Sequence, residues 1–423
     1  MIRSSSKIIL CQGLGILFSF LYLRMINQQL NIEEFAFWLT LITIVNWMQI
    51  MDFGVCNTLR NKLTEIQDFK SKRYQQLLTS AYSHFNVISV LCLVSISLFC
   101  YVVDFPGIIG YEKISNNVLS PMILLFSGVV SFRYSFINSV FYSLNKPELV
   151  AFKQMIVQTF FLISVMALNV LQLGSLILIA VCYLASTLSA NMLFFNYVKK
   201  TIKYKPRHSR YKRKLMKKMK FDNGKFFILQ LSGLIFYSTD MVLISKLLGG
   251  ESAASYNIGN KIFNFVIIAQ GAYMGPLWTK YTSEFRDKNY NNILSLYKKS
   301  IILSLFLCFT QSIVYFYSET LIELWLGSNK LFSREIFLSL TILTIVRVLS
   351  SNFSTFLNSR SMLNTQVSCS IFAMVINIPL SIYFVKIFNF GAEGVAIATI
   401  LSLIPFLVLG FLRVRKELKG LCL

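Results

Sequence analysis

The most constraining feature of this chain is a series of apolar runs that recur to its C-terminus, each long enough to cross a lipid bilayer. A membrane-spanning helix needs about 20 apolar residues. The candidate spans are 8–30, 35–57, 76–101, 117–143, 149–171, 173–198, 224–248, 253–278, 297–318, 335–357, 363–386 and 391–412. Only 14% of the 423 residues are charged and 55% are hydrophobic. We therefore expect a polytopic all-helical membrane protein, which excludes a soluble enzyme, a disordered chain and a secreted disulfide scaffold.

Positive charge alternates from loop to loop, and this alternation tests the number of spans. Lys and Arg concentrate in the cytoplasmic loops of membrane proteins. Of the 41 basic residues, 32 fall in the termini and the even-numbered loops, Lys146 and Lys153 among them, and only 6 fall on the other side. A wrong span count would scramble this pattern. We predict twelve crossings with both termini in the cytoplasm.

The net charge of +23 comes largely from one central stretch, KKTIKYKPRHSRYKRKLMKKMK (Lys199–Lys220). Nucleic-acid binding needs a basic face on a folded soluble domain, whereas this stretch joins two sets of six spans. We interpret it as a cytoplasmic linker that faces anionic lipid, and expect no nucleic-acid partner. The predicted organisation is an N-terminal lobe of residues 1–200, a linker of residues 201–222 and a C-terminal lobe of residues 223–423.

Weak self-similarity suggests that the two halves are repeats. At an offset of 218 residues Glu33 falls on Glu251 and Lys62 on Lys280, and at an offset of 214 the string RYSFIN (Arg133–Asn138) falls on RVLSSN (Arg347–Asn352). Six spans per half give both halves the same orientation, so this would be a parallel repeat about an axis along the membrane normal.

Four charged residues lie near the middle of predicted spans. Even a lenient insertion scale assigns about 2.5–3.5 kcal/mol to an Arg or Lys in mid-span, so such side chains normally face a water-filled cavity or a partner. Arg133 and Arg347 have no acid at their depth in the same half, and we expect them to line a hydrated, cationic cavity. A hairpin about the GGES turn would bring Asp240 and Lys261 to one depth, where a structural ion pair and a functional gate both remain open.

Polar residues within or near the spans extend this candidate site. Arg24 lies near the outer end of the first span, where it could snorkel to the interface or join the pathway. Amide side chains either line a cavity for a sugar-like ligand or join helices, the commoner use. They are Asn46, Gln49, Asn138, Gln158, Asn191, Gln230, Gln270, Asn352 and Asn377.

The chain lacks the residue patterns of an enzyme. Its two histidines, His84 and His208, have no metal-ligand spacing, its eight cysteines form no CxxC pair, and it has no Walker loop. We expect no cofactor and no metal. This leaves a secondary transporter or flippase, which could be coupled to H⁺ or Na⁺, and an alternating-access transporter suits the chain better than a channel.

Three stretches resemble polysaccharide exporters of the multidrug/oligosaccharidyl-lipid/polysaccharide (MOP) superfamily, and in particular its O-antigen flippases. They are MDFGVCNTLRNKLTE (Met51–Glu65), FFILQLSGLIFYSTDMVLISKLLG (Phe226–Gly249) with ASYNIGNKIF (Ala254–Phe263), and GPLWTKYTSEF (Gly275–Phe285). The resemblance implies a MATE-like pair of six-helix lobes around a central cavity. It also implies transfer of undecaprenyl-diphosphate-linked oligosaccharide to the periplasmic leaflet of a bacterial inner membrane, in lipopolysaccharide biosynthesis. A polysaccharide polymerase and a chain-length regulator would be its partners.

Alternatives remain open. A cation-coupled multidrug antiporter of the same superfamily would want an acidic cavity, but Asp240 is the only mid-span carboxylate against three cations. A non-transporting scaffold for a glycan-synthesis complex would have its cavity closed by apolar packing. A membrane-embedded glycosyltransferase or polymerase should carry a large periplasmic loop or a catalytic acid cluster, and every outer loop here is short.

Overall fold

A computed structural model of the chain describes residues 2–50, 52–66, 68–102, 118–204, 212–326 and 332–421. Within these ranges the regular elements are all helices, which confirms the predicted fold class. The chain divides into two compact units, here called the N unit (Arg3–Asn223) and the C unit (Gly224–Leu423, with Met1–Ile2). The predicted linker ends just before this boundary, and its residues 205–211 lie outside the described ranges.

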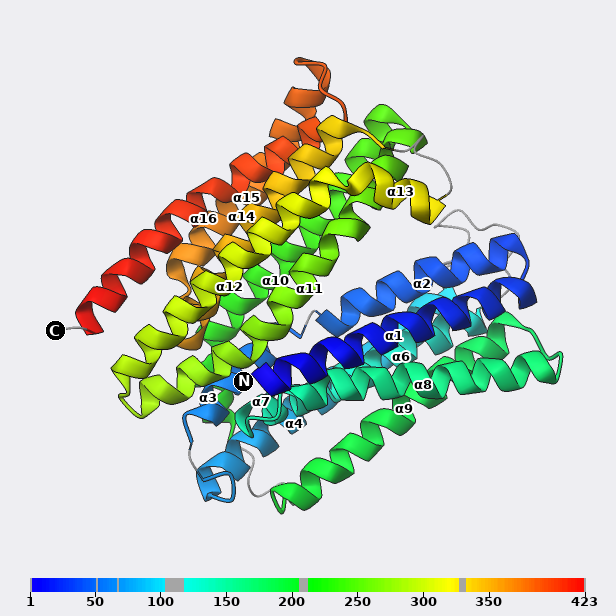
Figure 1. Cartoon of the computed structure of the whole chain (residues 1–423). Coiled ribbons are helices and arrows are strands. Elements are labelled where there is room, and N and C mark those ends of the chain that lie inside the picture. The colour runs from blue at the N-terminus through cyan, green and yellow to red at the C-terminus, as the bar shows by residue number, and fades with distance from the viewer. Residues whose placement is uncertain are drawn as a thin grey trace. The chain divides into compact units, whose positions relative to one another are not determined.

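Figure 1 shows the helices of both units. The chain enters the N unit with α1 (Ile2–Gln29), α2 (Ile32–Ile50), α3 (Val55–Thr64), α4 (Lys72–Val102), α6 (Leu119–Arg133), α7 (Phe136–Ser143), α8 (Glu148–Val170) and α9 (Leu176–Thr201). It continues with α10 (Arg213–Leu248), α11 (Gly250–Arg286), α12 (Tyr290–Phe316), α13 (Ser318–Leu326), α14 (Arg334–Ser359), α15 (Asn364–Lys386) and α16 (Ala392–Leu421). α10 begins in the N unit and crosses the boundary at Gly224.

Ten spans in the described part of the chain are long and apolar enough to cross a membrane, with α6 and α7 counted as one. They match ten of the twelve predicted spans. The other two, the second and the eighth, are α2 and α11. The apolar part of α2 is short, Phe37–Met48, and α11 carries Asn257, Asn260, Lys261 and Asn264 on one face. α11 is the less apolar of the two because its polar stripe lines a pocket, whereas α2 is strongly apolar over a short stretch.

The same helix pairings occur in both units. α6 packs against α2, α4 and α9, and α8 packs against α9; correspondingly, α14 packs against α11, α12 and α16, and α15 packs against α16. The α6–α7 span and α14 are the most buried of these spans, with 67% and 61% of their apolar windows buried. This pattern supports the predicted parallel repeat. It makes the helices that carry Arg133 and Arg347 the central helices of their units.

Two predicted spans of the N unit are interrupted. The first break separates α2 from α3, where Phe53 and Gly54 have φ angles of 54° and 71°. An L-residue helix cannot continue through this left-handed conformation. The buried carboxylate of Asp52 accepts hydrogen bonds from the backbone N–H groups of Gly54 (3.0 Å) and Cys56 (2.9 Å). Asp52 therefore caps α3, and the Asp-Phe-Gly string encodes a helix break.

The second break separates α6 from α7 at Tyr134 and Ser135. It lies against the first break, because Ser139 Oγ on α7 donates to the carbonyl oxygen of Cys56 on α3 at 2.7 Å. The Cys56 thiol also lies 3.4 Å from Ser135 Oγ. The short helices α3 and α7 are thus joined by polar contacts where both spans change direction.

Each unit has its own apolar core. In the N unit one cluster gathers around Leu78, Phe85 and Phe136, and in the C unit one gathers around Phe263 and Phe337. The serines at the starts of α9 and α14, Ser175 and Ser333, accept bonds from backbone N–H groups three residues later, as N-caps do. These contacts fix the helices from which the pockets are built.

Candidate functional site: polar pockets within each unit

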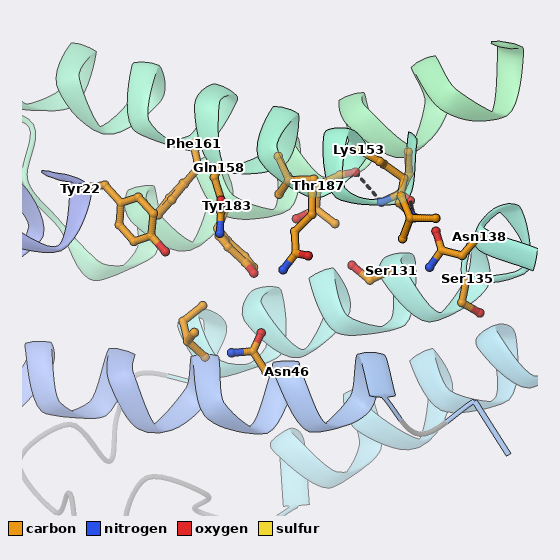
Figure 2. A pocket seen from close by; sticks show the side chains of 15 residues that line it. Tyr22, Asn46, Ser131, Ser135, Asn138, Lys153, Gln158, Phe161, Tyr183 and Thr187 are labelled. Carbon is orange, nitrogen blue, oxygen red and sulfur yellow. Dashed lines mark hydrogen bonds between the residues drawn. The ribbon is translucent and has the colours of Figure 1, made fainter. Parts of the chain in front are cut away.

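The N unit encloses a pocket of about 480 Å³ between α1, α2, α6, α7, α8 and α9, here called the N-unit pocket (Figure 2). Small-ligand pockets usually measure about 300–1,000 Å³. No acidic side chain is among the described residues that line it. The lining residues are Tyr22, Ile42, Asn46, Ser131, Ser135, Asn138, Val150, Lys153, Gln154, Val157, Gln158, Phe161, Tyr183, Thr187 and Asn191.

Lys153 on α8 supplies the positive charge of this pocket. Its ammonium group donates to Asn191 Oδ1 at 3.5 Å, the dashed bond in Figure 2. Asn191 Nδ2 in turn donates to the carbonyl oxygen of Thr187 at 2.8 Å. Both α9 residues are 2% exposed. None of the ion pairs between described residues involves Lys153, so a neutral amide holds this lysine.

The other end of the pocket is aromatic. Figure 2 places Tyr22, Phe161 and Tyr183 together, away from Lys153. The ring centroids of Tyr22 and Phe161 are 4.9 Å apart, those of Phe161 and Tyr183 are 5.1 Å apart, and both pairs meet edge to face. Trp38 stacks on Phe161 at 5.6 Å. Such interlocked rings give a pocket a rigid apolar wall.

The C unit holds two smaller pockets that share Arg347. The lysine–arginine pocket, about 220 Å³, is lined by Met241, Asn257, Asn260, Lys261, Phe263, Asn264, Ile267, Thr344 and Arg347. The serine pocket, about 240 Å³, is lined by Leu229, Ser232, Gly233, Phe236, Arg347, Ser350, Ser351, Ser354, Gln366, Cys369, Ser370, Ala373, Ser402, Leu403 and Phe406.

The lysine–arginine pocket brings two cations to one small space. Lys261 lies in a polar stripe of α11 with spacings of three, four and seven residues, so the stripe occupies one helix face. Arg347 comes from α14, which packs against α11. An ammonium and a guanidinium flanked by amide donors form a strong site for a phosphate or carboxylate group. The structure thus brings together two of the predicted site residues.

Asp240 belongs to a separate buried network in the C unit. Its carboxylate is 3% exposed and accepts a hydrogen bond from Tyr256 Oη at 3.0 Å. Thr399 Oγ1 lies 3.3 Å from the same carboxylate oxygen and accepts from Asn377 Nδ2 at 2.8 Å. The network joins four helices, α10, α11, α15 and α16, through side chains with almost no exposed surface.

One expectation about these charges is wrong. The ion pairs between described residues do not include Asp240 with Lys261. Tyr256 reaches Asp240 instead, and Lys261, five residues further along α11, lies about 140° around the helix from it and is exposed. Counting residues from the turn could not give the helix faces on which these groups lie.

Arg133 and Arg24 lie outside the linings of these three pockets. Arg133 is the last residue of α6, at the second helix break, with its guanidinium 5.6 Å from the Tyr134 ring centroid. Its side chain is partly buried, and its Nε has no hydrogen-bond partner. Arg24 is exposed on α1. Their roles in a substrate pathway stay predictions.

The asparagines Asn138 and Asn352 are repeat mates with different surroundings. Asn138 lines the N-unit pocket, and its Oδ1 is buried without a hydrogen-bond partner. Asn352 is 1% exposed and lines none of the three pockets. Its Nδ2 lies 2.7 Å from Ser304 Oγ on α12. Of the two, only Asn138 is placed to meet a ligand in these pockets, while Asn352 joins two helices.

Sequence analysis missed Lys153 as a pocket residue because it counted this lysine among the loop cations. The structure starts α8 at Glu148, directly after Pro147, so Lys153 lies in the second turn of a spanning helix. The predicted span 149–171 already contains Lys153, and proline is favoured at helix starts, so both signals could have placed this lysine inside the membrane. The in-span amides Asn46, Gln158 and Asn191 do line the same pocket.

Solved structures with the same fold are membrane transporters. An outward-facing multidrug resistance MATE family transporter of the MOP superfamily aligns with a TM-score of 0.81 at 12% identity over 99% of this chain and 95% of that one. A MOP superfamily transporter from Pyrococcus furiosus aligns with a TM-score of 0.82 at 12% identity over 100% and 96%. A Vibrio cholerae MATE transporter in the bent form gives 0.77 at 14% identity over 99% and 97%. The fold is therefore MATE-like.

Sequence comparison identifies the family. A putative O-antigen export protein from Yersinia pseudotuberculosis is 22% identical over 356 residues, which cover 82% of this chain and 80% of that protein. Residues 227–383 match the MatE family model. Residues 1–277 match the model described as polysaccharide biosynthesis protein, and the chain belongs to this family. It is a multi-pass membrane transporter of the MOP superfamily and not an enzyme.

Proposed function

We propose that this protein is a flippase for undecaprenyl-diphosphate-linked oligosaccharide repeat units of O-antigen or a similar polysaccharide. In this proposal it moves them from the cytoplasmic to the periplasmic leaflet by alternating access. The observation that carries the proposal is the lysine–arginine pocket, where Lys261 and Arg347 line one space with three asparagines. A diphosphate group needs such paired cations, while the lipid tail can stay in the bilayer.

The other predicted site residues take supporting roles in this proposal. Asp240 is the proposed coupling group for H⁺ or Na⁺, because it is a buried carboxylate whose hydrogen-bond network joins four helices. Arg133 and Arg24 remain proposed cations of the pathway, and Asn138 a proposed ligand contact. The family membership and the O-antigen export relative support this choice of cargo.

Substitution of the paired cations tests the cargo. The double variant Lys261→Gln/Arg347→Gln should abolish surface polysaccharide in a strain that depends on this protein, because the diphosphate loses both counter-charges. Immunoblotting of membranes must show a normal protein level, and lipid-linked repeat units should accumulate inside the cell. Normal surface polymer in this double variant would refute the proposal.

The proposed location is the bacterial inner membrane, with both termini in the cytoplasm. Polysaccharide polymerase and a chain-length regulator are the proposed partners, because a flipped repeat unit must be polymerised. A C-terminal green fluorescent protein fusion should fluoresce, whereas a C-terminal alkaline phosphatase fusion should be inactive. An active phosphatase would place the C-terminus in the periplasm and contradict the twelve-span topology.

A cation-coupled multidrug antiporter is the second candidate, favoured by the MATE-like fold and the buried carboxylate of Asp240. The pockets argue against cationic drugs, because lysine and arginine line them and no acid is among their described lining residues. Drug-sensitivity profiling of a deletion strain separates the candidates. Loss of surface polysaccharide with unchanged drug sensitivity supports the flippase, and the converse supports the antiporter.

A further inference from the structure

The N-unit pocket differs in charge from the lysine–arginine pocket. Its lining carries one cation, Lys153, and no acid among the described residues, together with five carboxamide side chains. A lysine ammonium is a compact point charge, whereas bidentate recognition of phosphate favours arginine. A single lysine among neutral amides therefore suits one negative charge, such as a carboxylate, better than a diphosphate.

The remaining lining suits a sugar ring. The wall made by Tyr22, Phe161 and Tyr183 lies at the end away from Lys153 (Figure 2). An aromatic surface packs against the apolar C–H face of a pyranose, and hydroxyl and amide groups around the rim hydrogen-bond its hydroxyls. Two buried polar atoms in the lining, Asn138 Oδ1 and Thr187 Oγ1, have no partner in the structure. Buried polar atoms are normally satisfied, so these two atoms are candidates for bonds to a ligand.

A glycine on α1 makes room for one of the pocket amides. At Gly15 an added Cβ would overlap Gln158 Oε1. Gln158 lines the pocket from α8 and lies between Lys153 and Phe161 along that helix. The missing side chain at position 15 therefore lets this amide occupy its place, and Gly15→Ala must displace Gln158.

We infer that the N-unit pocket binds an acidic sugar of the repeat unit, a pyranose bearing a carboxylate, with Lys153 holding the carboxylate and the aromatic wall holding the ring. The inference rests on the proposed flippase function and adds a cargo specificity to it. In this proposal the C unit binds the diphosphate of the substrate, and the N unit binds a charged sugar of the same substrate.

Binding of simple sugars to the full-length protein in nanodiscs tests the inference. Methyl glucuronide and methyl glucoside are the probes, and saturation-transfer NMR reports their contact with the protein. We expect the glucuronide to bind more tightly, and Lys153→Gln to weaken it about tenfold because a charge-assisted contact is lost. Lys153→Arg should keep most of the binding, and Gly15→Ala should weaken both sugars.

The matched control is Lys146→Gln. Lys146 is an exposed lysine just before α8, donates to Tyr197 Oη at 3.1 Å and does not line the pocket. Its loss should leave glucuronide binding unchanged. The inference is overturned if Lys153→Gln binds the glucuronide as tightly as the wild type does. It is also overturned if the wild type binds the glucoside equally well, or if inorganic pyrophosphate displaces the glucuronide, since the pocket would then serve the diphosphate.

Export assays separate failure of this inference from failure of the proposed function. Hosts with an acidic and with a neutral repeat unit each receive the wild type and Lys153→Gln. Selective loss of the acidic polymer with Lys153→Gln supports the inference, and equal export of both polymers by this variant overturns it. Export of neither polymer by the wild type would refute the flippase function, while the binding result would still decide what the pocket recognises.

Discussion

The two units share one packing scheme but interrupt their helices differently. In the N unit the chain breaks between α2 and α3, where Asp52 caps the new helix. In the C unit the corresponding helix, α11, runs on without a break. At the offset of 218 residues Asp52 corresponds to Gln270, whose Nε2 reaches Ser304 Oγ (3.0 Å) and Ser351 Oγ (2.7 Å) on α12 and α14.

The corresponding helix of the C unit, α11, nevertheless lacks a backbone hydrogen bond at the equivalent position. Pro276 lies inside α11, and a proline in a helix removes the hydrogen bond to the carbonyl four residues earlier, here that of Ala272. Ala272 corresponds to Gly54 of the N unit at the same offset. One unit thus uses a capped break and the other a proline to interrupt backbone hydrogen bonding at one position of the repeat. Both units therefore interrupt backbone hydrogen bonding at the same repeat position, although they use different residues to do so.

The first prediction tests whether the two central arginines are equivalent. Arg347 lines two pockets from a continuous helix, whereas Arg133 ends α6 at a break and lines none of the three pockets. Arg347→Gln should lower polysaccharide export about tenfold or more, the loss expected for one charge-assisted contact. Arg133→Gln should lower it less. Surface polymer per amount of protein in the membrane measures both. Equal losses would show that the pockets do not distinguish the two residues.

The second prediction compares the polar groups at the interruption. Asp52→Ala removes the cap of a buried helix start and should destabilise the protein by about 1–2 kcal/mol. Gln270→Ala removes bonds between helices, for which membrane proteins show about 0.6–1.7 kcal/mol. Unfolding in detergent, followed by the midpoint of a denaturant titration, measures each loss. A larger loss for Gln270→Ala would show that the C unit depends more on its polar network than the N unit does on its cap.

Much of the fold follows from apolar runs and alternating charge, because both are set by the bilayer and are visible in one sequence. The helix breaks were not visible in the same way. Asp52, Phe53 and Gly54 sit in an otherwise continuous apolar run, and only the hydrogen bonds of Asp52 show that it caps a helix. A hydropathy average over about 20 residues does not detect a helix break of two or three residues.

The candidate site was harder to predict than the fold. Sequence reasoning identified Lys261, Arg347 and Asn138 from the cost of burying polar groups, and each lines a pocket. It could not decide which helix face each group occupies, so it paired Asp240 with Lys261 where the structure pairs Asp240 with Tyr256. Facing directions depend on packing between helices far apart in the chain.

The third prediction separates the two asparagines that occupy one position of the repeat. Asn138→Ala should reduce export while leaving the melting temperature unchanged, because Asn138 lines a pocket and its Oδ1 has no partner. Asn352→Ala should instead destabilise the protein by about 1 kcal/mol, since it loses its contact with Ser304. Melting curves and export assays on both variants provide the measurement. The comparison fails if Asn138→Ala destabilises the protein as much as Asn352→Ala does.

The smallest expected effect concerns two ion pairs whose lysines are repeat mates. Lys62 lies 3.3 Å from Glu65, and both side chains are largely exposed, whereas Lys280, its mate at the offset of 218, lies 2.6 Å from Glu284, whose side chain is 8% exposed. Burial alone would raise the pKa of Glu284. Hydrogen bonds from Lys280 and Asn292 and the charge of Lys280 outweigh burial and hold this pKa below its ordinary value.

A carboxyl whose pKa is lower in the folded than in the unfolded protein stabilises the fold fully above its unfolded pKa, about 4.3 for Glu, and loses this contribution as the pH falls through the folded value. Near pH 7, Glu284→Gln should therefore cost about 0.2–1 kcal/mol, at the lower end because Lys280 is half exposed. Glu65→Gln should cost less, since water screens both of its partners. Unfolding midpoints at neutral and acidic pH measure these costs, and the difference between wild type and Glu284→Gln should shrink in acid. A pH-independent difference would mean that Glu284 stabilises the end of α11 by packing and not by its charge.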